Sequence, residues 1–205
     1  MKHHHIRRIR TALLSTVLLG SGNALAQDGH FFATGLEAAY ATYDGDIDAD
    51  GFWIRGYGAS HGTKQGESGV FMDFGARGLS SNEVNVNILD ANFHFGWSYS
   101  VADDVALYGA LGYDYRDISL PYPTDDLSGG GIGFRFGGTF QISPKAQLHT
   151  QFRQVDHGGD LSDADSFTGI RLGFQYLVGE NWGVSGEYDQ EDGDGGFVLG
   201  VFLGN

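Results

Sequence analysis

Residues 89–99 read "LDANFHFGWSY", and they alternate between two kinds of side chain. One side carries Leu89, Ala91, Phe93, Phe95, Trp97 and Tyr99, and the other carries Asp90, Asn92, His94, Gly96 and Ser98. Successive side chains of a β-strand point to opposite faces of a sheet, so this stretch predicts a strand with one apolar and one polar face. A strand between hydrocarbon and water has this alternation.

The same period recurs in ten segments, and most of them have about 10–13 residues, enough for a tilted strand to cross a bilayer. They lie near residues 33–43, 52–61, 69–79, 85–100, 105–118, 130–142, 146–156, 167–178, 182–191 and 196–204. We therefore expect an all-β, transmembrane, antiparallel up-and-down barrel of ten strands. If segment 52–61, where glycines blur the alternation, or segment 196–204 is not a strand, the barrel has eight strands, because an even number is expected.

The segments between these strands also alternate in kind. "SVADDV", "SPKAQ" and "VGENW" are tight turns, whereas 44–51, 119–130, 157–166 and 191–196 are longer and acidic or rich in glycine. Short periplasmic turns and longer external loops are typical of outer-membrane barrels. The connections 61–68 and 80–84 fit this scheme less well, because the first is long for a turn and the second is short for a loop.

Charged side chains test which face points inward. In lipid the backbone must be paired internally, so a strand protein must close into a barrel with its apolar face outward. Lys64 and Lys145 lie in turns, and every arginine after residue 26 lies on the polar face of a segment. Because arginine pairs well with carboxylates, we predict ion pairs in the barrel interior. The predicted members are Glu37, Arg55, Asp73, Arg77, Asp90, Asp114, Arg116, Arg135, Arg153, Arg171, Glu187 and Asp189.

Tyrosine and tryptophan residues cluster toward the ends of the predicted strands. Trp97, Tyr99, Tyr176 and Trp182 would mark the periplasmic boundary of the membrane, and Tyr40, Tyr113, Tyr115 and Tyr188 the opposite boundary. Two such aromatic belts are expected at the two membrane interfaces.

The first 26 residues have the pattern of a secretory signal peptide. A positive head, "MKHHHIRRIR", precedes a short apolar stretch, "TALLSTVLLG", and Ala24-x-Ala26 predicts cleavage between Ala26 and Gln27. Residues 27–205 then form a single barrel domain. All 26 Asp and Glu residues lie after the signal peptide, whereas four of the 12 Lys and Arg residues lie within it. The acidic remainder argues against nucleic acid as a partner, and without cysteine no disulfide holds the fold.

The acidic run "DGDIDADG" is a weak candidate for a metal site, formed by Asp44, Asp46, Asp48 and Asp50. It copies the first half of a calcium-binding EF-hand loop, but position twelve is Tyr57 instead of glutamate, and its flanks are strands. Two interpretations remain, namely a solvated anionic rim and weak binding of divalent cations that bridge to lipopolysaccharide phosphates. We expect no cofactor.

Gly-aromatic strands such as "LYGALGYDYR" and "GIGFRFGGTFQIS" resemble the small outer-membrane β-barrel proteins of Gram-negative bacteria, the porin-like or OmpA-type barrel domains. The resemblance covers the whole chain after the signal peptide. It implies a place in the cell outer membrane, contact with membrane lipid and lipopolysaccharide, and help from periplasmic chaperones and the barrel-assembly machinery. Members usually end in an aromatic residue, whereas the last aromatic residue here is Phe202. The resemblance leaves the oligomeric state open.

Several functions fit such a barrel. A filled lumen would make it a structural protein, and a partly open lumen would make it a narrow cation-biased channel. Some small barrels are lipid A-modifying enzymes or omptin proteases, for which His157 beside Asp156 and Asp160 is the candidate here; His94 and His149 are expected to be hydrogen-bonded inside the barrel. A soluble secreted ligand-binding barrel would need an apolar lumen and a polar exterior, the reverse of the predicted faces.

Overall fold

The computed structural model describes residues 34–44, 48–59, 65–81, 83–121, 125–161 and 167–204 of the chain. The expected signal peptide, with its cleavage site between Ala26 and Gln27, lies outside these residues, and so do Asp46 and Lys64. Ten strands and one short 3-10 helix form in chain order. They are β1 (Thr34–Asp44), β2 (Ala49–Ala59), β3 (Ser68–Ser81), β4 (Val86–Ala102), β5 (Val105–Ser119), β6 (Leu127–Ser143), β7 (Ala146–His157), η1 (Gly159–Leu161), β8 (Phe167–Leu177), β9 (Trp182–Glu191) and β10 (Asp194–Gly204).

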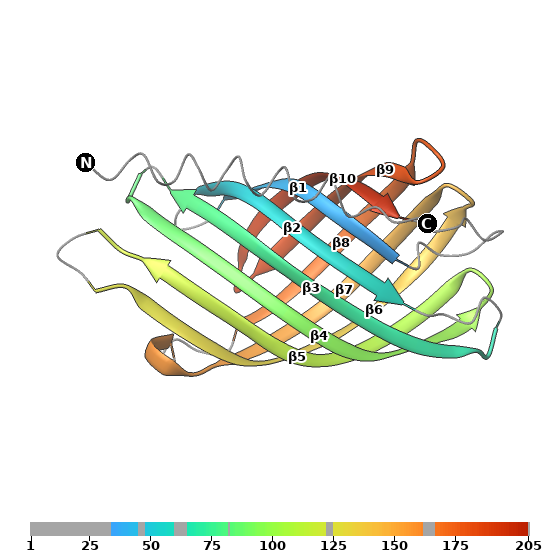
Figure 1. Ribbon diagram of the computed structural model, residues 1–205, viewed down its shortest axis with the longest axis horizontal. Helices are drawn as coiled ribbons and strands as arrows, with labels where there is room; N and C mark the ends of the chain where they lie inside the picture. Colours follow the sequence, from blue (N-terminus) through green and yellow to red (C-terminus); the bar gives the residue numbers. More distant parts are fainter. Residues whose placement is uncertain are drawn as a thin grey trace.

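The strands close into one barrel, in which each strand pairs antiparallel with its neighbours in sequence and β1 also pairs with β10 (Figure 1). The fold prediction of a ten-stranded up-and-down barrel is therefore confirmed. The eight-stranded alternative is wrong, because the two uncertain segments form β2 and β10, which pair with β1 along its length. No helix among the described residues is long and apolar enough to cross a membrane.

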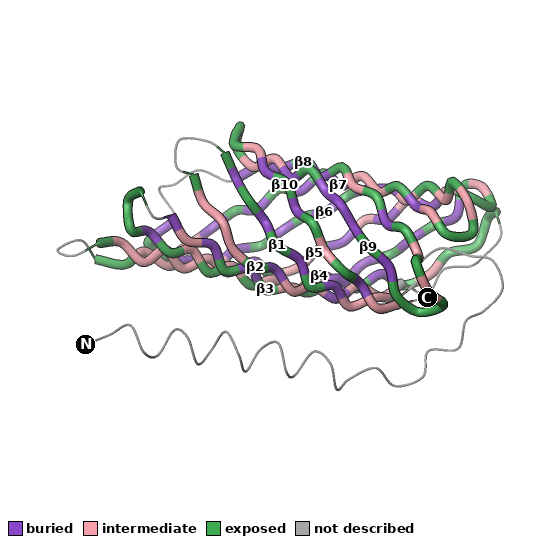
Figure 2. Tube along the Cα trace, turned by 90° about the horizontal axis from the view of Figure 1, so that it is seen from above, coloured by how far each residue is buried: buried purple, intermediate pink, exposed green. Residues whose placement is uncertain are grey.

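Buried and exposed residues alternate along the strands, as Figure 2 shows. Most charged residues of the inner face are buried, and Glu37, His94 and Asp189 are each 1% exposed or less. Large apolar residues of the outer face are open, and Trp97 and Ile132 are 66% and 71% exposed. The apolar face therefore points outward along the strands, and the polar face lines the lumen.

The two ends of the barrel are named here by their connections. The loop end carries the β1–β2, β3–β4, β5–β6, β7–β8 and β9–β10 connections, and the turn end carries the other four together with Thr34 and Gly204. The short helix η1 belongs to the loop end. Its Leu161 is buried, and a side chain on the inward-facing Gly129 would meet Leu161 Cβ at 3.0 Å, so the helix lies against the inner face of β6.

One loop prediction is wrong. The sequence suggested a long loop at 191–196, but Asp192 and Gly193 alone connect β9 to β10, and Glu191 pairs with Asp194. Both connecting residues have positive φ, 51° and 104°, which is typical of the tight type I′ hairpin turn that Asp-Gly favours. The strand pairing therefore continues through Glu191, and this carboxylate lies on the same face as Glu187 and Asp189.

Candidate functional site: the ion-paired lumen

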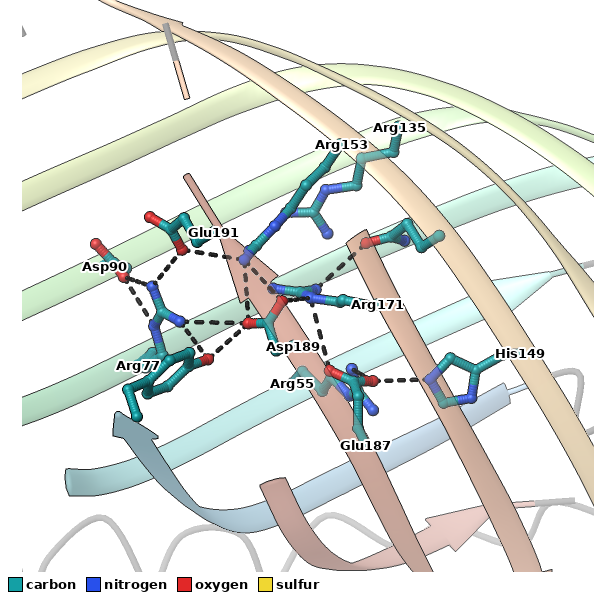
Figure 3. A network of polar contacts seen from close by, with 12 residues as sticks. Arg55, Arg77, Asp90, Arg135, His149, Arg153, Arg171, Glu187, Asp189 and Glu191 are labelled. Carbon is teal, nitrogen blue, oxygen red and sulfur yellow. Dashed lines mark hydrogen bonds and ion pairs between the residues drawn. The ribbon is translucent and has the colours of Figure 1, made fainter. Parts of the chain in front are cut away.

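Asp189 of β9 is the centre of the polar network in the lumen (Figure 3). Its side chain is fully buried and accepts hydrogen bonds from Arg153 Nη2 at 2.8 and 3.0 Å, Arg171 Nε at 3.2 Å and Tyr43 Oη at 2.6 Å. Arg77 Nη1 lies 3.5 Å away. The partners come from β1, β3, β7 and β8, so a single carboxylate connects strands from opposite sides of the barrel.

Two further carboxylates extend the network toward the loop end. Asp90 accepts from Arg77 Nε at 2.8 Å and Arg116 Nε at 2.7 Å. Glu191 accepts from Arg77 Nη2 at 3.1 Å, from Arg153 Nη2 at 3.0 Å and from Arg116. Each of these three arginines therefore has at least two carboxylate partners. We call the group formed by Asp90, Glu191, Asp189 and the arginines that contact them the charged layer.

The ion-pair network continues from Asp189 toward the turn end, through Glu187 and Glu37. Arg55 donates from Nε to Glu37 at 2.9 Å and from Nη1 to Glu187 at 2.9 Å. His149 Nε2 lies 2.7 Å from Glu187 Oε2, and Ser185 donates to Glu37 at 2.8 Å. Both glutamates are therefore shared between strands that are far apart in sequence.

A third group of charges joins β3, β4, β5 and β6. Arg135 pairs with Asp73 and, through Nη2, with Asp114 Oδ1 at 3.3 Å, while His94 Nε2 lies 2.9 Å from Asp114 Oδ2. Space for this group comes from Gly133, because a Cβ there would lie 1.9 Å from Asp114 Oδ2 and 2.6 Å from His94 Nε2. The inward glycine thus allows a buried charge pair.

Aromatic rings support the guanidinium groups. The guanidinium carbons of Arg171, Arg55 and Arg77 lie 4.3, 5.0 and 5.8 Å from the ring centre of Trp53, which is itself buried. Phe167 contacts two other guanidinium groups at 5.1 and 5.2 Å. A cation near an aromatic face within about 6 Å is attracted by the ring, so these rings hold the arginines in place as well as filling space.

The turn end of the lumen is filled differently, by a group that we call the aromatic–amide layer. Phe71 and Tyr108 stack with ring centres 4.4 Å apart and an interplanar angle of 16°. Gln151 donates to Tyr108 Oη at 3.0 Å, and Gln175 donates to Tyr57 Oη at 3.0 Å. This layer uses stacking and amide–hydroxyl hydrogen bonds instead of ion pairs, and Gln151 Oε1 connects it to the charged layer by accepting from Arg171 Nη1 at 3.3 Å.

Little open space lies beside the charged layer. A cavity lined by Trp53, Asp90, Asn92 and four of the arginines has a volume of about 20 Å³. One water molecule needs roughly 10–15 Å³ by such a measure, so this cavity has room for about one. The lumen at this level is therefore occupied by side chains.

All twelve residues predicted to form interior ion pairs do so in the lumen, nine of them around Asp189 and its neighbours and three in the group of Asp73, Asp114 and Arg135. The predicted inward histidines also lie in it, since His94 contacts Asp114 and His149 contacts Glu187. Sequence reasoning missed Glu191, because it was assigned to a loop, and it missed Tyr43 and Trp53. The Asp-Gly turn signal at 192–193 and the two-residue spacing of Glu187, Asp189 and Glu191 could have identified Glu191 as an inward residue.

The candidate catalytic pair does not form. Alternation along β7 places Asp156 on the exposed outer side of the strand and His157 on the inner side, where its ring lies 5.5 Å from the ring of Phe167. Asp160 Oδ2 instead accepts from the backbone N of Ser128 at 3.5 Å. The three residues therefore have separate contacts.

The aromatic residues predicted to form two belts all lie exposed on the outer face, with exposed fractions from 37% to 66%. These are Tyr40, Trp97, Tyr99, Tyr113, Tyr115, Tyr176, Trp182 and Tyr188. Tyr40 lies near the loop end and donates to Asp50 Oδ2 at 2.8 Å, and Trp182 begins β9 at the turn end. Tyr113 lies near the middle of β5, away from the strand ends.

The acidic run is only partly visible, because Asp46 lies outside the described residues. Asp44 ends β1, Asp48 is exposed in the connection, and Asp50 belongs to β2. Within the described ranges, no group of three or more His, Cys, Asp or Glu residues is arranged to hold a metal ion. The arrangement therefore provides no argument for a metal site.

Comparisons with known proteins bear on the fold alone. No protein-family model matches the chain, and no curated protein matches it in sequence. Similar solved structures are all β-barrels. The translocator domain of autotransporter NalP from Neisseria meningitidis is 14% identical with a TM-score of 0.44, over 96% of this chain and 95% of that one. Ail, the attachment invasion locus protein of Yersinia pestis, is 14% identical with a TM-score of 0.39, over 83% and 95%. The NanC porin is 12% identical with a TM-score of 0.44, over 82% and 98%.

Proposed function

We propose that this chain is an integral outer-membrane barrel with a closed lumen, which serves as a structural protein of the envelope instead of a diffusion pore. The observation that carries the proposal is the filling of the lumen by six arginines among seven carboxylates, most of them almost fully buried. Wide aqueous lumens belong to barrels of about 16–18 strands, whereas small barrels have room mainly for side chains.

The exterior supports insertion in a membrane. Along the middle of the strands the outer face carries large exposed apolar residues on every strand, such as Phe74, Phe93, Leu111, Phe136 and Leu172. A continuous apolar band of this kind needs an apolar environment. A soluble ligand-binding barrel has its apolar side chains inside, so the distribution observed here disfavours that alternative.

The position in the cell is also part of the proposal. Residues 1–26 would direct export, and the acidic loop end would face outward, near lipopolysaccharide, while the turn end faces the periplasm. Periplasmic chaperones and the barrel-assembly machinery would act during biogenesis. Sedimentation with outer membranes and heat-modifiable migration on a gel test this placement, and recovery in the soluble periplasmic fraction would contradict it.

A narrow cation-biased channel is the second candidate. Seven carboxylates face six arginines in the lumen, and described residues of the loop-end connections, such as Asp48, Asp125 and Asp126, are acidic. A surplus of negative charge attracts cations and repels anions. Any small leak through this barrel would therefore favour cations.

Planar-bilayer recording of the refolded protein separates the two candidates. We expect the native barrel to show no steady conductance steps, because side chains fill the lumen. Trp53→Ala should open it and give cation-selective steps, since three guanidinium groups lose the ring that they contact. Trp97→Ala, on the outer face, is the control and should leave the current at the native level. Large anion-selective steps from the native protein would contradict both candidates.

A further inference from the structure

A hollow lies on the outer face over strands β6 to β10. It has a volume of about 530 Å³, within the range of roughly 300–1,000 Å³ that is usual for small-molecule sites. Its lining is mainly apolar and includes Phe140, Leu148, Leu172, Phe174 and Leu199. A lipid, a soluble ligand and part of a second copy of the chain could all occupy this volume. The shape and the surroundings of the hollow are what favour one of them.

Strand register shows that the hollow is a groove between two rows of outward side chains. One wall is the row of register partners Phe140, Leu148, Phe174, Gly186 and Leu199, and the other is the row Thr150, Leu172, Tyr188 and Phe197. Backbone of the inward residues His149, Gly173 and Glu187, which pair with one another, lies between the rows. The groove therefore crosses the strands and is long and narrow.

Glycine at position 186 shapes one wall of the groove. Gly186 faces outward, and a Cβ there would lie 2.5 Å from Cε1 of its register partner Phe174, so the Phe174 ring can lie over the glycine only because it has no side chain. Four inter-strand steps of about 4.8 Å give a length of about 19 Å. For strands tilted by about 40°, a groove across them rises by about 12 Å along the barrel axis, less than half of the roughly 30 Å hydrocarbon core. A chain in the groove would therefore remain within one leaflet.

The turn that follows the Phe140 end of the groove carries a positive charge. Phe140 is near the end of β6, and the β6–β7 turn that follows contains Lys145. Lys145 is exposed and forms no ion pair with any part of the chain that the structure describes, and it is the one Lys or Arg in that part that lies outside the lumen. From this turn the groove rises to Leu199 in the middle of β10. Charge at one end and apolar walls along the rest match a phospholipid.

We propose that this groove binds one phospholipid of the leaflet at the turn end, with an acyl chain lying between the two rows and the phosphate beside Lys145. The inference rests on the proposed insertion in a membrane, because only a membrane supplies such a ligand to the outer face. It goes further by predicting a single, ordered lipid at a defined place on the barrel.

Native mass spectrometry of the refolded full barrel, equilibrated with phosphatidylglycerol in detergent, tests the proposal. We expect one retained lipid per barrel. Gly186→Leu displaces the Phe174 ring from the wall of the groove and should lower the occupancy at least tenfold, and Lys145→Gln should lower it several-fold. Gly56→Leu is the matched control, because Gly56 also faces outward, lies outside the groove, and a Cβ there would likewise overlap the ring of its register partner, Phe74. Equal retention by the native protein and Gly186→Leu would overturn the site.

A second measurement needs no variant. A spin-labelled phosphatidylglycerol should broaden the methyl NMR signals of Leu148, Leu172 and Leu199 more than that of Leu111, which lies outward on β5. Uniform broadening would mean a nonspecific lipid shell and would overturn the proposal. A dimer that Gly186→Leu dissociates would also overturn it, because a second copy would then occupy the groove.

Flotation of the same preparations with liposomes distinguishes this inference from the proposed function. A barrel that floats with liposomes but retains no lipid contradicts the lipid site alone. A barrel that does not float contradicts membrane insertion, and with it both proposals.

Discussion

The two ends of the lumen are filled by different chemistry. In the charged layer, Asp189 and Glu191 are each shared by at least three arginines or tyrosines from distant strands. In the aromatic–amide layer, Phe71 stacks on Tyr108, whose hydroxyl accepts from the neutral amide of Gln151. The comparison indicates that the charged layer depends on its members jointly, because removal of one carboxylate leaves several buried arginines with one partner fewer, whereas the other layer depends on shape.

The largest expected effect comes from Asp189→Asn. This change leaves Arg153 and Arg171 with one buried carboxylate fewer, and removing one partner of a buried ion pair costs about 3–5 kcal/mol. Urea unfolding of the barrel in lipid vesicles, followed by tryptophan fluorescence, measures the free energy of unfolding. The control, Asp156→Asn on the outer side of β7, should change it by about 0.5 kcal/mol or less. Equal losses in both variants would show that the charged layer is not cooperative.

A smaller loss of stability is expected from a change in the β9–β10 turn, which positions Glu191 in the charged layer. Gly193 has a φ of 104°, and a side chain at positive φ costs about 1–2 kcal/mol. Gly193→Ala should therefore destabilise the barrel by that amount in the same unfolding experiment. Gly158→Ala is the control, because Gly158 lacks a positive φ and a Cβ there would make only an ordinary contact, 3.5 Å from the Gly130 carbonyl oxygen. A neutral Gly193→Ala would mean that the turn does not fix Glu191.

The aromatic–amide layer should tolerate the loss of a polar atom best. Tyr108→Phe removes the hydrogen bond from Gln151 but keeps the ring that stacks on Phe71. The expected loss is about 0.5–1.5 kcal/mol, the usual net value of one hydrogen bond. Tyr113→Phe, on the exposed outer face, serves as its control. A loss from Tyr108→Phe as large as that from Asp189→Asn would remove the distinction between the two layers.

Strand alternation was enough to predict the fold and the interior position of every arginine. A shift of one residue in the alternation of a strand would have moved its charge to the outer face. Segment 52–61 was ambiguous since Gly56 and Gly58 carry no side chain to show their face, and only pairing with β1 and β3 settles it. Contacts within the lumen were beyond prediction. They depend on which strands face each other across the closed barrel, as when Arg77 of β3 contacts Asp189 of β9.

The sharing of Asp189 has a consequence for how the barrel is assembled. Its partners Tyr43, Arg77, Arg153 and Arg171 lie on β1, β3, β7 and β8. The β8–β9 hairpin supplies Arg171 alone, so the full set of partners forms only when the barrel closes. Until β1 meets β10, these charges need water. Closure of the sheet and expulsion of water from the lumen should therefore occur in one concerted step, and a half-closed barrel would have no stable place within the bilayer.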